Sequence, residues 1–113
     1  MIEDDFSPLP SVQHVNDQAH FRAVAVDIDI NDHVNNTVYM DWALRAVPAA
    51  ARHQIPLRLE AAFLGEARLG DEILCCGEST VKDGGTIVAQ SLRDAASGRE
   101  LTRLRWDFLK SVN

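Results

Sequence analysis

The segment TVYMDWALRAV (residues 37–47) constrains the fold of this chain more than any other feature. When the segment is placed on a helix, apolar side chains point in almost every direction, and only Asp41, Arg45 and Arg52 form a narrow polar stripe. A helix that is apolar nearly all round is expected to be buried. A chain of 113 residues makes one domain, so we expect the rest of the domain to wrap around this helix.

Residues with special backbone properties predict where the helix begins and ends. Asn35 or Asn36 should cap the first turn, because an Asn side chain can accept a hydrogen bond from a free N–H there. Pro48 should interrupt the helix or start a new turn, since proline lacks the N–H that a helix interior needs. We therefore expect one long helix from Asn36 to about Val47.

Segments on both sides of the helix have the alternation of half-buried β-strands. In residues 100–109, Leu104, Trp106 and Phe108 alternate with charged side chains, and residues 57–63 have the same pattern. Glycine-rich stretches between the apolar segments indicate tight turns. The predicted strands are residues 21–26, 57–63, 72–81, 86–94 and 100–109, with turns at 82–85 and 95–98.

This order of elements predicts the fold class. A strand, one helix and four consecutive strands joined by short turns make an antiparallel sheet and an α+β domain. One long buried helix inside a curved antiparallel sheet is the hotdog fold. We therefore predict a hotdog domain over residues 21–113.

Charge divides the chain into a tail and a body. The net charge is −6, and residues 1–20 hold four of the 17 acidic residues but no Lys or Arg. We interpret residues 1–20 as an acidic tail or linker. The nearly neutral body lacks the basic stripe of nucleic-acid-binding proteins, so we expect no nucleic-acid partner. Basic residues late in the chain are most simply solvated strand faces, with a docking patch for an acidic partner as the alternative; they are Arg93, Arg99, Arg103, Arg105 and Lys110.

The sequence also bears on location and cofactors. The start, MIEDDFSPLP, has neither the basic nor the apolar region of a secretory signal, and no apolar run is long enough to span a bilayer. We expect a cytoplasmic protein without membrane insertion. The four histidines lack metal-ligand spacing, so we predict no metal and no cofactor. Cys75 and Cys76 are adjacent in an apolar strand, which favours buried, inert thiols over a disulfide or a nucleophile.

A dense polar segment, residues 27–36, joins the first strand to the helix. It ends at a helix N-terminus, whose free N–H groups and positive dipole can stabilise an oxyanion. In an extended backbone, Asp27, Asp29, Asn31 and His33 would share one side. Carboxylates there could act as base or nucleophile, Asn could orient water or a carbonyl group, and His could move a proton.

A simpler interpretation of the polar segment has no catalytic content. Asp and Asn gather in loops and caps because their side chains bond to nearby backbone. This explanation fits Asp32, Asn35 and Asn36 at least as well as a functional one. His33 taken alone is equally compatible with an ordinary surface or core histidine.

A second candidate, Glu66, follows a break in the strand pattern. In FLGEARLGDEI, Gly65 interrupts the alternation just before this glutamate. A glycine at such a position often marks a bulge or a close backbone approach, which could turn Glu66 towards the start of the helix. By composition alone, a solvated glutamate at a strand end explains the residue better.

The motif DIDINDHVNNTVYMDWALRAVP (residues 27–48) resembles the signature of acyl-ACP thioesterases. The second hotdog domain of that family carries a D-x-D-x-N-x-H-V-N-N stretch followed by an aromatic-rich helix that ends near a proline, and every one of these positions matches. A weaker resemblance continues through LEAAFLGEARLGDEI. After Ile73, only the pattern of strands agrees.

The resemblance implies roles for individual residues. Glu66 would activate or position water, and the position after it, a cysteine in some plant members, is Ala67 here, which excludes a cysteine nucleophile at that site. The helix would form both the core of the domain and one side of an acyl channel. The implied catalytic residues are Asp29, Asn31, His33 and Glu66, and the implied substrate-binding residues are Val34, Asn35, Asn36 and Tyr39.

The resemblance implies a thioester hydrolase that releases fatty acids from acyl-carrier protein or coenzyme A. The alternatives are a hotdog thioesterase for small or aromatic acyl-CoA, in which Asp29 attacks the thioester directly, and a non-catalytic acyl-binding or dimerisation module. A hydratase acting on acyl double bonds fits the start of the helix less well. Acyl length, carrier, and whether Asp29 or Glu66 is the principal base stay open.

The resemblance covers only one of the family's two hotdog domains. The chain is therefore expected to be either a single-domain relative that self-associates or half of a two-domain enzyme. A lone hotdog domain leaves one face of its sheet and helix uncovered. We expect a homodimer, or a dimer of dimers, to cover it.

Overall fold

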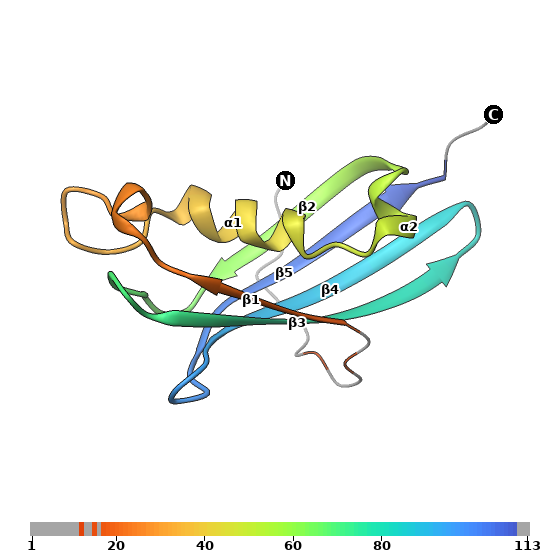
Figure 1. The fold of residues 1–113 in the computed structure, drawn as a ribbon. Coiled ribbons are helices and arrows are strands. Elements are labelled where there is room, and N and C mark those ends of the chain that lie inside the picture. Colours follow the sequence, from red (N-terminus) through yellow and green to blue (C-terminus); the bar gives the residue numbers. More distant parts are fainter. Residues whose placement is uncertain (1–11, 13–14, 16, 111–113) are drawn as a thin grey trace.

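The computed structural model describes residues 12, 15 and 17–110. In this part of the chain, a five-stranded antiparallel sheet with strand order β1-β3-β4-β5-β2 curves beneath one helix (Figure 1). The predicted α+β class and the curved sheet with its helix are confirmed. The elements are β1 (Asp17–Arg22), the 3₁₀ turn η1 (Ala25–Asp27), α1 (Asn36–Arg45), α2 (Ala49–Arg52), β2 (Ile55–Phe63), β3 (Glu72–Lys82), β4 (Gly85–Asp94) and β5 (Glu100–Leu109).

The first strand differs from the prediction by four residues. It begins at Asp17 and ends at Arg22, so residues 17–20 belong to the sheet although the sequence had placed them in the tail. The inward side chains are Ala19 and Phe21, which are opposite Cys75 and Ile73 of β3. The rest of the predicted tail lies outside the described residues, apart from positions 12 and 15.

The chain leaves the sheet directly after β1. Ala23 exchanges hydrogen bonds with the loop before β3, since its N–H donates to Asp71 O (3.0 Å) and its carbonyl accepts from Gly70 N (2.9 Å). The chain then turns into η1, where Val26 is 90% exposed. Residues 23–26 of the predicted strand are therefore outside the sheet strand β1, because both valines belong to this turn.

The helix begins as predicted and ends two residues early. The side chain of Asn35 caps it by accepting the N–H of Thr37 at 3.0 Å. The last helical residue is Arg45: the N–H of Ala46 is shared between the carbonyls of Trp42 and Ala43, and that of Val47 bonds only three residues back, to Leu44. Pro48 disfavours helical backbone at Val47 and then starts the short α2.

Only one face of α1 is buried. Tyr39, Trp42 and Ala43 pack towards the sheet, whereas Leu44 is 43% exposed and Asp41 forms an ion pair with Arg45 on the outer side. The sheet therefore wraps the inner side of the helix, and the outer side is left uncovered, as expected for a lone hotdog domain. A single sheet can cover only one side of a helix, so the apolar outer positions are left without cover.

Buried and more exposed side chains alternate along β5 as predicted, and Trp106 of this strand helps to anchor the helix. Trp106 and Phe108 are buried, and their rings stack with centroids 5.8 Å apart. The indole N–H of Trp106 donates to Gln90 Oε1 at 2.7 Å, and Gln90 Nε2 donates to the carbonyl of Ala43 in α1, also at 2.7 Å. This buried polar bridge connects β5, β4 and the helix.

The opposite face of the sheet carries several of the late basic residues, and acidic neighbours contact three arginines on it. Arg103 pairs with Glu100 at 2.8 Å and Arg105 with Asp107 at 3.2 Å, and Arg58 of β2 pairs with Glu60 at 3.2 Å. Mixed, paired charges give a solvated face of little net potential. They do not favour a docking patch for an acidic partner.

The turns agree with the glycine signals in the sequence. β3 and β4 are joined at Asp83 and Gly84, and Gly84 has a φ angle of +78°, which side chains other than glycine rarely adopt. Neither α-helix in the described part of the chain has the length and apolarity needed to cross a membrane.

We expect the Gln90→Met substitution to lower the free energy of unfolding by about 1–3 kcal/mol, because it leaves the indole N–H of Trp106 buried without an acceptor. Urea denaturation followed by circular dichroism measures the change. Gln18→Met, on the exposed side of β1, is the matched control and should cost less than about 0.5 kcal/mol. Equal effects in the two variants would contradict a structural role for the bridge.

Candidate active site

The polar segment before the helix folds into a compact loop. Ile28 and Val34 form an isolated antiparallel bridge, and the N–H of Asp29 donates to the carbonyl of His33 at 2.9 Å. The carboxylate of Asp29 accepts the N–H of Asn31 at 2.8 Å and that of His33 at 3.4 Å. Asp29 therefore holds the loop closed from inside.

This loop differs from the extended arrangement expected from the sequence. Because the chain reverses between Asp29 and His33, alternate residues do not share one side. Asp32 at the tip has a φ angle of 63°, a left-handed conformation that Asp tolerates better than most side chains. The local explanation proposed for loop Asp residues thus applies to Asp29, whose side chain bonds to nearby backbone.

The N-terminus of α1 begins beside this loop. Asn35 accepts from both the N–H and the hydroxyl of Thr37, and its own N–H donates to the carbonyl of Asp27 at 3.0 Å. Asn35, Asn36 and Thr37 are all exposed. The first turn of the helix therefore faces solvent next to His33.

Glu66 meets His33 across the fold. The Nδ1 atom of His33 lies 2.7 Å from Oε2 of Glu66, although the two residues are 33 positions apart. The side chain of Glu66 is 63% exposed and that of His33 is 26% exposed. A carboxylate bonded to one ring nitrogen orients the imidazole, so that the other nitrogen can exchange a proton with a ligand.

The glycine before Glu66 lies just after the end of β2 and against the start of β5. The N–H groups of Leu64 and Gly65 both donate to the carbonyl of Leu101, at 2.8 and 3.1 Å. A Cβ atom on Gly65 would lie 3.1 Å from Nη1 of Arg99 and 3.4 Å from the carbonyl of Glu100. Two successive N–H groups that share one carbonyl form a bulge-like break in the strand pairing, as the sequence suggested, and Glu66 follows this break towards the loop.

Other residues of the motif lie behind the surface. Val34 is buried, and its N–H donates to the carbonyl of Ala67 at 2.9 Å. Tyr39 is also buried, and its hydroxyl accepts the N–H of Ala67 at 2.8 Å. Burial raises the pKa of the Tyr39 phenol above its ordinary value, so this hydroxyl stays neutral.

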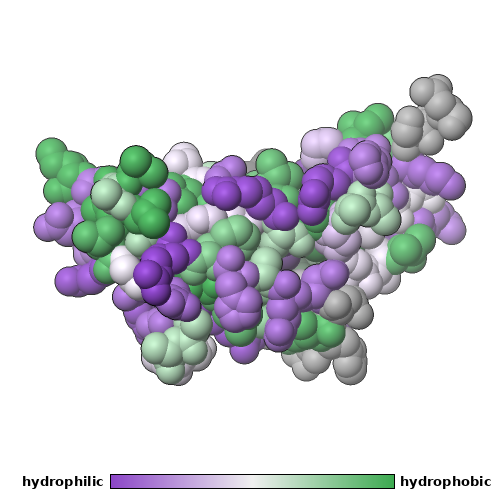
Figure 2. Space-filling view, viewed as in Figure 1, coloured by the Kyte–Doolittle hydropathy of each residue, from purple (hydrophilic) through white to green (hydrophobic). Residues whose placement is uncertain are grey.

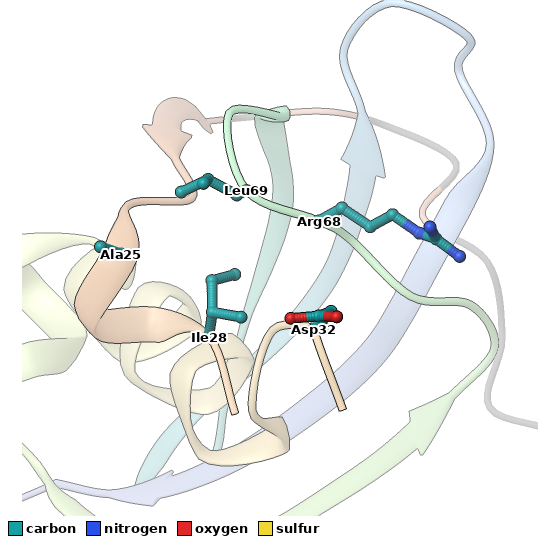
Figure 3. A pocket seen from close by; sticks show the side chains of 5 residues that line it. All are labelled: Ala25, Ile28, Asp32, Arg68 and Leu69. Carbon is teal, nitrogen blue, oxygen red and sulfur yellow. The ribbon is translucent and has the colours of Figure 1, made fainter. Parts of the chain in front are cut away.

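A pocket of about 510 Å³ opens beside the loop (Figure 3). The side chains of Ala25, Ile28 and Leu69 give it apolar walls, and Asp32 lies at its polar side. Arg68 also lines it, although its guanidinium group extends away from the other labelled side chains in Figure 3. The sequence pattern did not indicate that these apolar residues line a pocket. Only Ile28 stood out, as an apolar residue between Asp27 and Asp29.

Hydrophobic surface gathers at the same end of the molecule. Figure 2 shows it where η1 and the loop of residues 28–34 lie in Figure 1. Exposed apolar residues here include Val26, Ile30 at 95% exposure, and Leu69. The His33–Glu66 pair thus belongs to a region with an apolar pocket, a helix N-terminus and an uncovered apolar surface.

Of the four residues expected to be catalytic, the structure brings two side chains together. His33 contacts Glu66, and Asp29 contacts the backbone of His33. Asn31 is exposed, and its bond to Asp29 comes from its backbone N–H. The described residues contain no group of three or more His, Cys, Asp or Glu side chains that could hold a metal ion.

A comparison with protein families decides where this domain belongs. The family model of the acyl-ACP thioesterase C-terminal domain matches residues 10–110. The chain belongs to this family. No curated protein sequence matches the chain closely enough to add a relative.

Solved structures share the fold of this acyl-ACP thioesterase domain. The 12:0-ACP thioesterase from Umbellularia californica has a TM-score of 0.85 at 17% identity, over 94% of this chain and 40% of that chain. A 1,4-dihydroxy-2-naphthoyl-CoA thioesterase from Synechocystis has a TM-score of 0.75 at 14% identity, over 82% and 80%. A Thermus thermophilus thioesterase complexed with coenzyme A and Zn has a TM-score of 0.78 at 16% identity, over 87% and 86%.

The cysteines of this acyl-ACP thioesterase domain lie apart from the loop. Cys75 and Cys76 are both free and buried in β3, and the position after Glu66 is Ala67. Burial raises the pKa of the Cys75 thiol to about 12, with a smaller contribution from Cys76. The thiol is therefore protonated at neutral pH and is a poor nucleophile.

We expect the protein to lose stability in alkali because of Cys75. The unfolded thiol ionises near its ordinary pKa of 9.0, while the folded thiol keeps its proton up to about 12. Stability is therefore constant below pH 9 as far as this group is concerned and falls as the pH rises from 9 towards 12. Urea denaturation between pH 8 and 11 should show a smaller loss in Cys75→Ala than in the wild type. An identical loss would contradict the assignment.

Proposed function

We propose that this domain hydrolyses fatty acyl thioesters carried by acyl-carrier protein or coenzyme A. The observation that carries the proposal is the contact of His33 with Glu66 at 2.7 Å, next to the exposed start of α1, in a chain that belongs to the acyl-ACP thioesterase family. The apolar pocket beside the loop supports an acyl substrate.

The reaction can be written with the residues of this site. Glu66 takes a proton from water, and the water oxygen adds to the carbonyl carbon of the thioester. The positive end of the α1 dipole stabilises the oxyanion of the tetrahedral intermediate. The C–S bond then breaks, and His33 helps to deliver the proton to the leaving thiolate, so that water and thioester become carboxylic acid and thiol.

Asp29 has a different task in this proposal. Its carboxylate already accepts two N–H groups of the loop, which supports a role in shaping the loop around His33. Glu66 is largely exposed and bonded to the imidazole, which supports Glu66 as the principal base. Asn31 and Asn36, both exposed beside the loop, are proposed to hold water or the carbonyl group.

Two carriers and two acyl classes remain candidates. The family match favours fatty acyl groups on acyl-carrier protein, whereas the likeness to the Synechocystis naphthoyl-CoA enzyme favours an aromatic acyl-CoA as the second candidate. A hydrolysis panel of C4–C18 acyl-CoA, the same chains on acyl-carrier protein, and benzoyl-CoA distinguishes them. Absence of hydrolysis on every substrate would favour a non-catalytic acyl-binding module.

The uncovered surfaces support a homodimer. β2 is an edge of the sheet, so one side of its backbone is free to pair with another strand. Its residues Ile55 and Leu57 are exposed, as is Leu44 of α1. We propose that a second copy of the chain covers these positions, as a dimer or a dimer of dimers.

Free thiols at both cysteines suit a reducing compartment such as the cytoplasm, and fatty acid metabolism is the proposed setting.

We expect Glu66→Ala to lower kcat by about 10²–10⁴-fold, because it removes the proposed base. Asp29→Asn keeps an oxygen that can accept the loop N–H groups, so it should lose activity less than Asp29→Ala does. Steady-state hydrolysis of the best acyl thioester measures both. Glu60→Ala, which removes an ion-paired carboxylate of β2, is the control. A Glu66→Ala variant as active as Glu60→Ala would show that the site is misassigned.

Light scattering at micromolar concentration should give at least twice the 12.5 kDa mass of one chain. Leu57→Glu should reduce the mass to that of the monomer, because a charge at the β2 edge opposes strand pairing. Val81→Glu places the same charge at another exposed apolar residue, near the end of β3, and should leave the mass unchanged. A wild-type monomer would contradict the homodimer and favour half of a two-domain enzyme.

A further inference from the structure

The position of Glu66 needs an explanation, because the residue belongs to neither a helix nor a strand. The residue lies in the segment between the end of β2 and the start of β3, and its side chain is largely exposed. An exposed glutamate in such a segment would ordinarily sample many conformations. Here the carboxylate lies against His33, so the backbone on either side of Glu66 must supply the order.

We infer that Tyr39 and Arg99 are positioning residues that hold the Glu66–Ala67 segment from opposite sides and thereby place the Glu66 carboxylate on His33. The inference rests on the proposed function of Glu66. Neither residue needs to contact the substrate for this role. Tyr39 is 1% exposed and acts from within the core.

The inner contact is the hydroxyl of Tyr39, which accepts the N–H of Ala67 at 2.8 Å. The Tyr39 ring is itself fixed by Trp42, edge-on with centroids 5.7 Å apart, and by Phe63, with centroids 6.1 Å apart. The carbonyl of Ala67 accepts from Val34. Buried Ala67 therefore ties the segment of Glu66 to α1 through Tyr39, and to the neighbour of His33 through Val34.

The outer contact is the guanidinium group of Arg99. Its Nη2 atom donates to the carbonyl of Glu66 at 3.2 Å. Gly65 leaves room for this approach, since a Cβ atom there would lie 3.1 Å from Nη1 of the same arginine. Arg99 thus fixes the carbonyl side of Glu66 while Tyr39 fixes the N–H of the next residue.

Both contacts act on the geometry between carboxylate and imidazole. A displacement of about 1 Å in a catalytic group can cost about 10²-fold in rate. Loosening the segment should therefore lower kcat and leave KM nearly unchanged, because binding of the acyl chain and its carrier is not affected. A purely structural role would lower stability without this selective loss of kcat.

The first test is Tyr39→Phe, which keeps the ring and removes the hydroxyl. We expect kcat to fall about 10- to 100-fold with KM within about twofold, and the amide hydrogen of Ala67, followed by NMR, to exchange faster with solvent. Gln90→Met removes another buried hydrogen bond between the helix and the sheet, away from Ala67. It should lower stability and keep kcat within about twofold.

Arg99→Ala tests the outer contact without a risk of unfolding, because the residue is exposed. We expect a fall in kcat of about three- to tenfold with KM unchanged. The inference is overturned if both variants keep wild-type kcat, if KM alone changes, if Gln90→Met loses as much kcat as Tyr39→Phe, or if exchange of the Ala67 amide does not change.

Glu66→Ala separates this inference from the proposed function. Full activity in Glu66→Ala would overturn the role of Glu66 and, with it, any role for residues that position it. An inactive Glu66→Ala together with fully active Tyr39→Phe and Arg99→Ala would leave the proposed function in place and overturn the positioning inference alone.

Discussion

Burial of one face of α1 against the curved sheet is the constraint on which the rest of this domain depends. Trp42 and Ala43 face the sheet, and Gln90 fixes the carbonyl of Ala43 from β4. Because the helix cannot rotate without exposing these groups, its first turn always points out beside the loop. The same rigid helix presents Tyr39 to Ala67 and so connects the core with the proposed base.

The one-sided burial also explains the surfaces that stay apolar. One sheet covers one side of a helix, so Leu44 on the outer side keeps its contact with solvent. The edge strand β2 adds exposed leucines and an unpaired backbone. The 12:0-ACP thioesterase from Umbellularia californica, of which this chain covers 40%, is more than twice as long. A second copy of this chain is our proposal for the missing cover.

Prediction from sequence succeeded where the pattern is local. The alternation in β5, the Asn35 cap and the turn at Gly84 each depend on a few neighbouring residues, and each is present. Prediction from sequence failed at β1. Residues 21–26 alternate about as well as Asp17–Arg22, and only the pairing with β3 determines which of the two segments forms the strand. The extended arrangement expected around Asp29 was wrong for a different, local reason, because the Asp29 side chain bonds to its own loop and the chain reverses there.

The sequence by itself determined the family of this domain, its α+β class and the cluster of polar residues before the helix. These follow from residue types at fixed spacings, which need no knowledge of distant contacts. Only the tertiary structure decided that Glu66 lies 2.7 Å from His33 and that Ala67 is held between Tyr39 and Val34. Such contacts join residues about 30 positions apart, and their geometry depends on how the helix packs on the sheet, which no local pattern encodes.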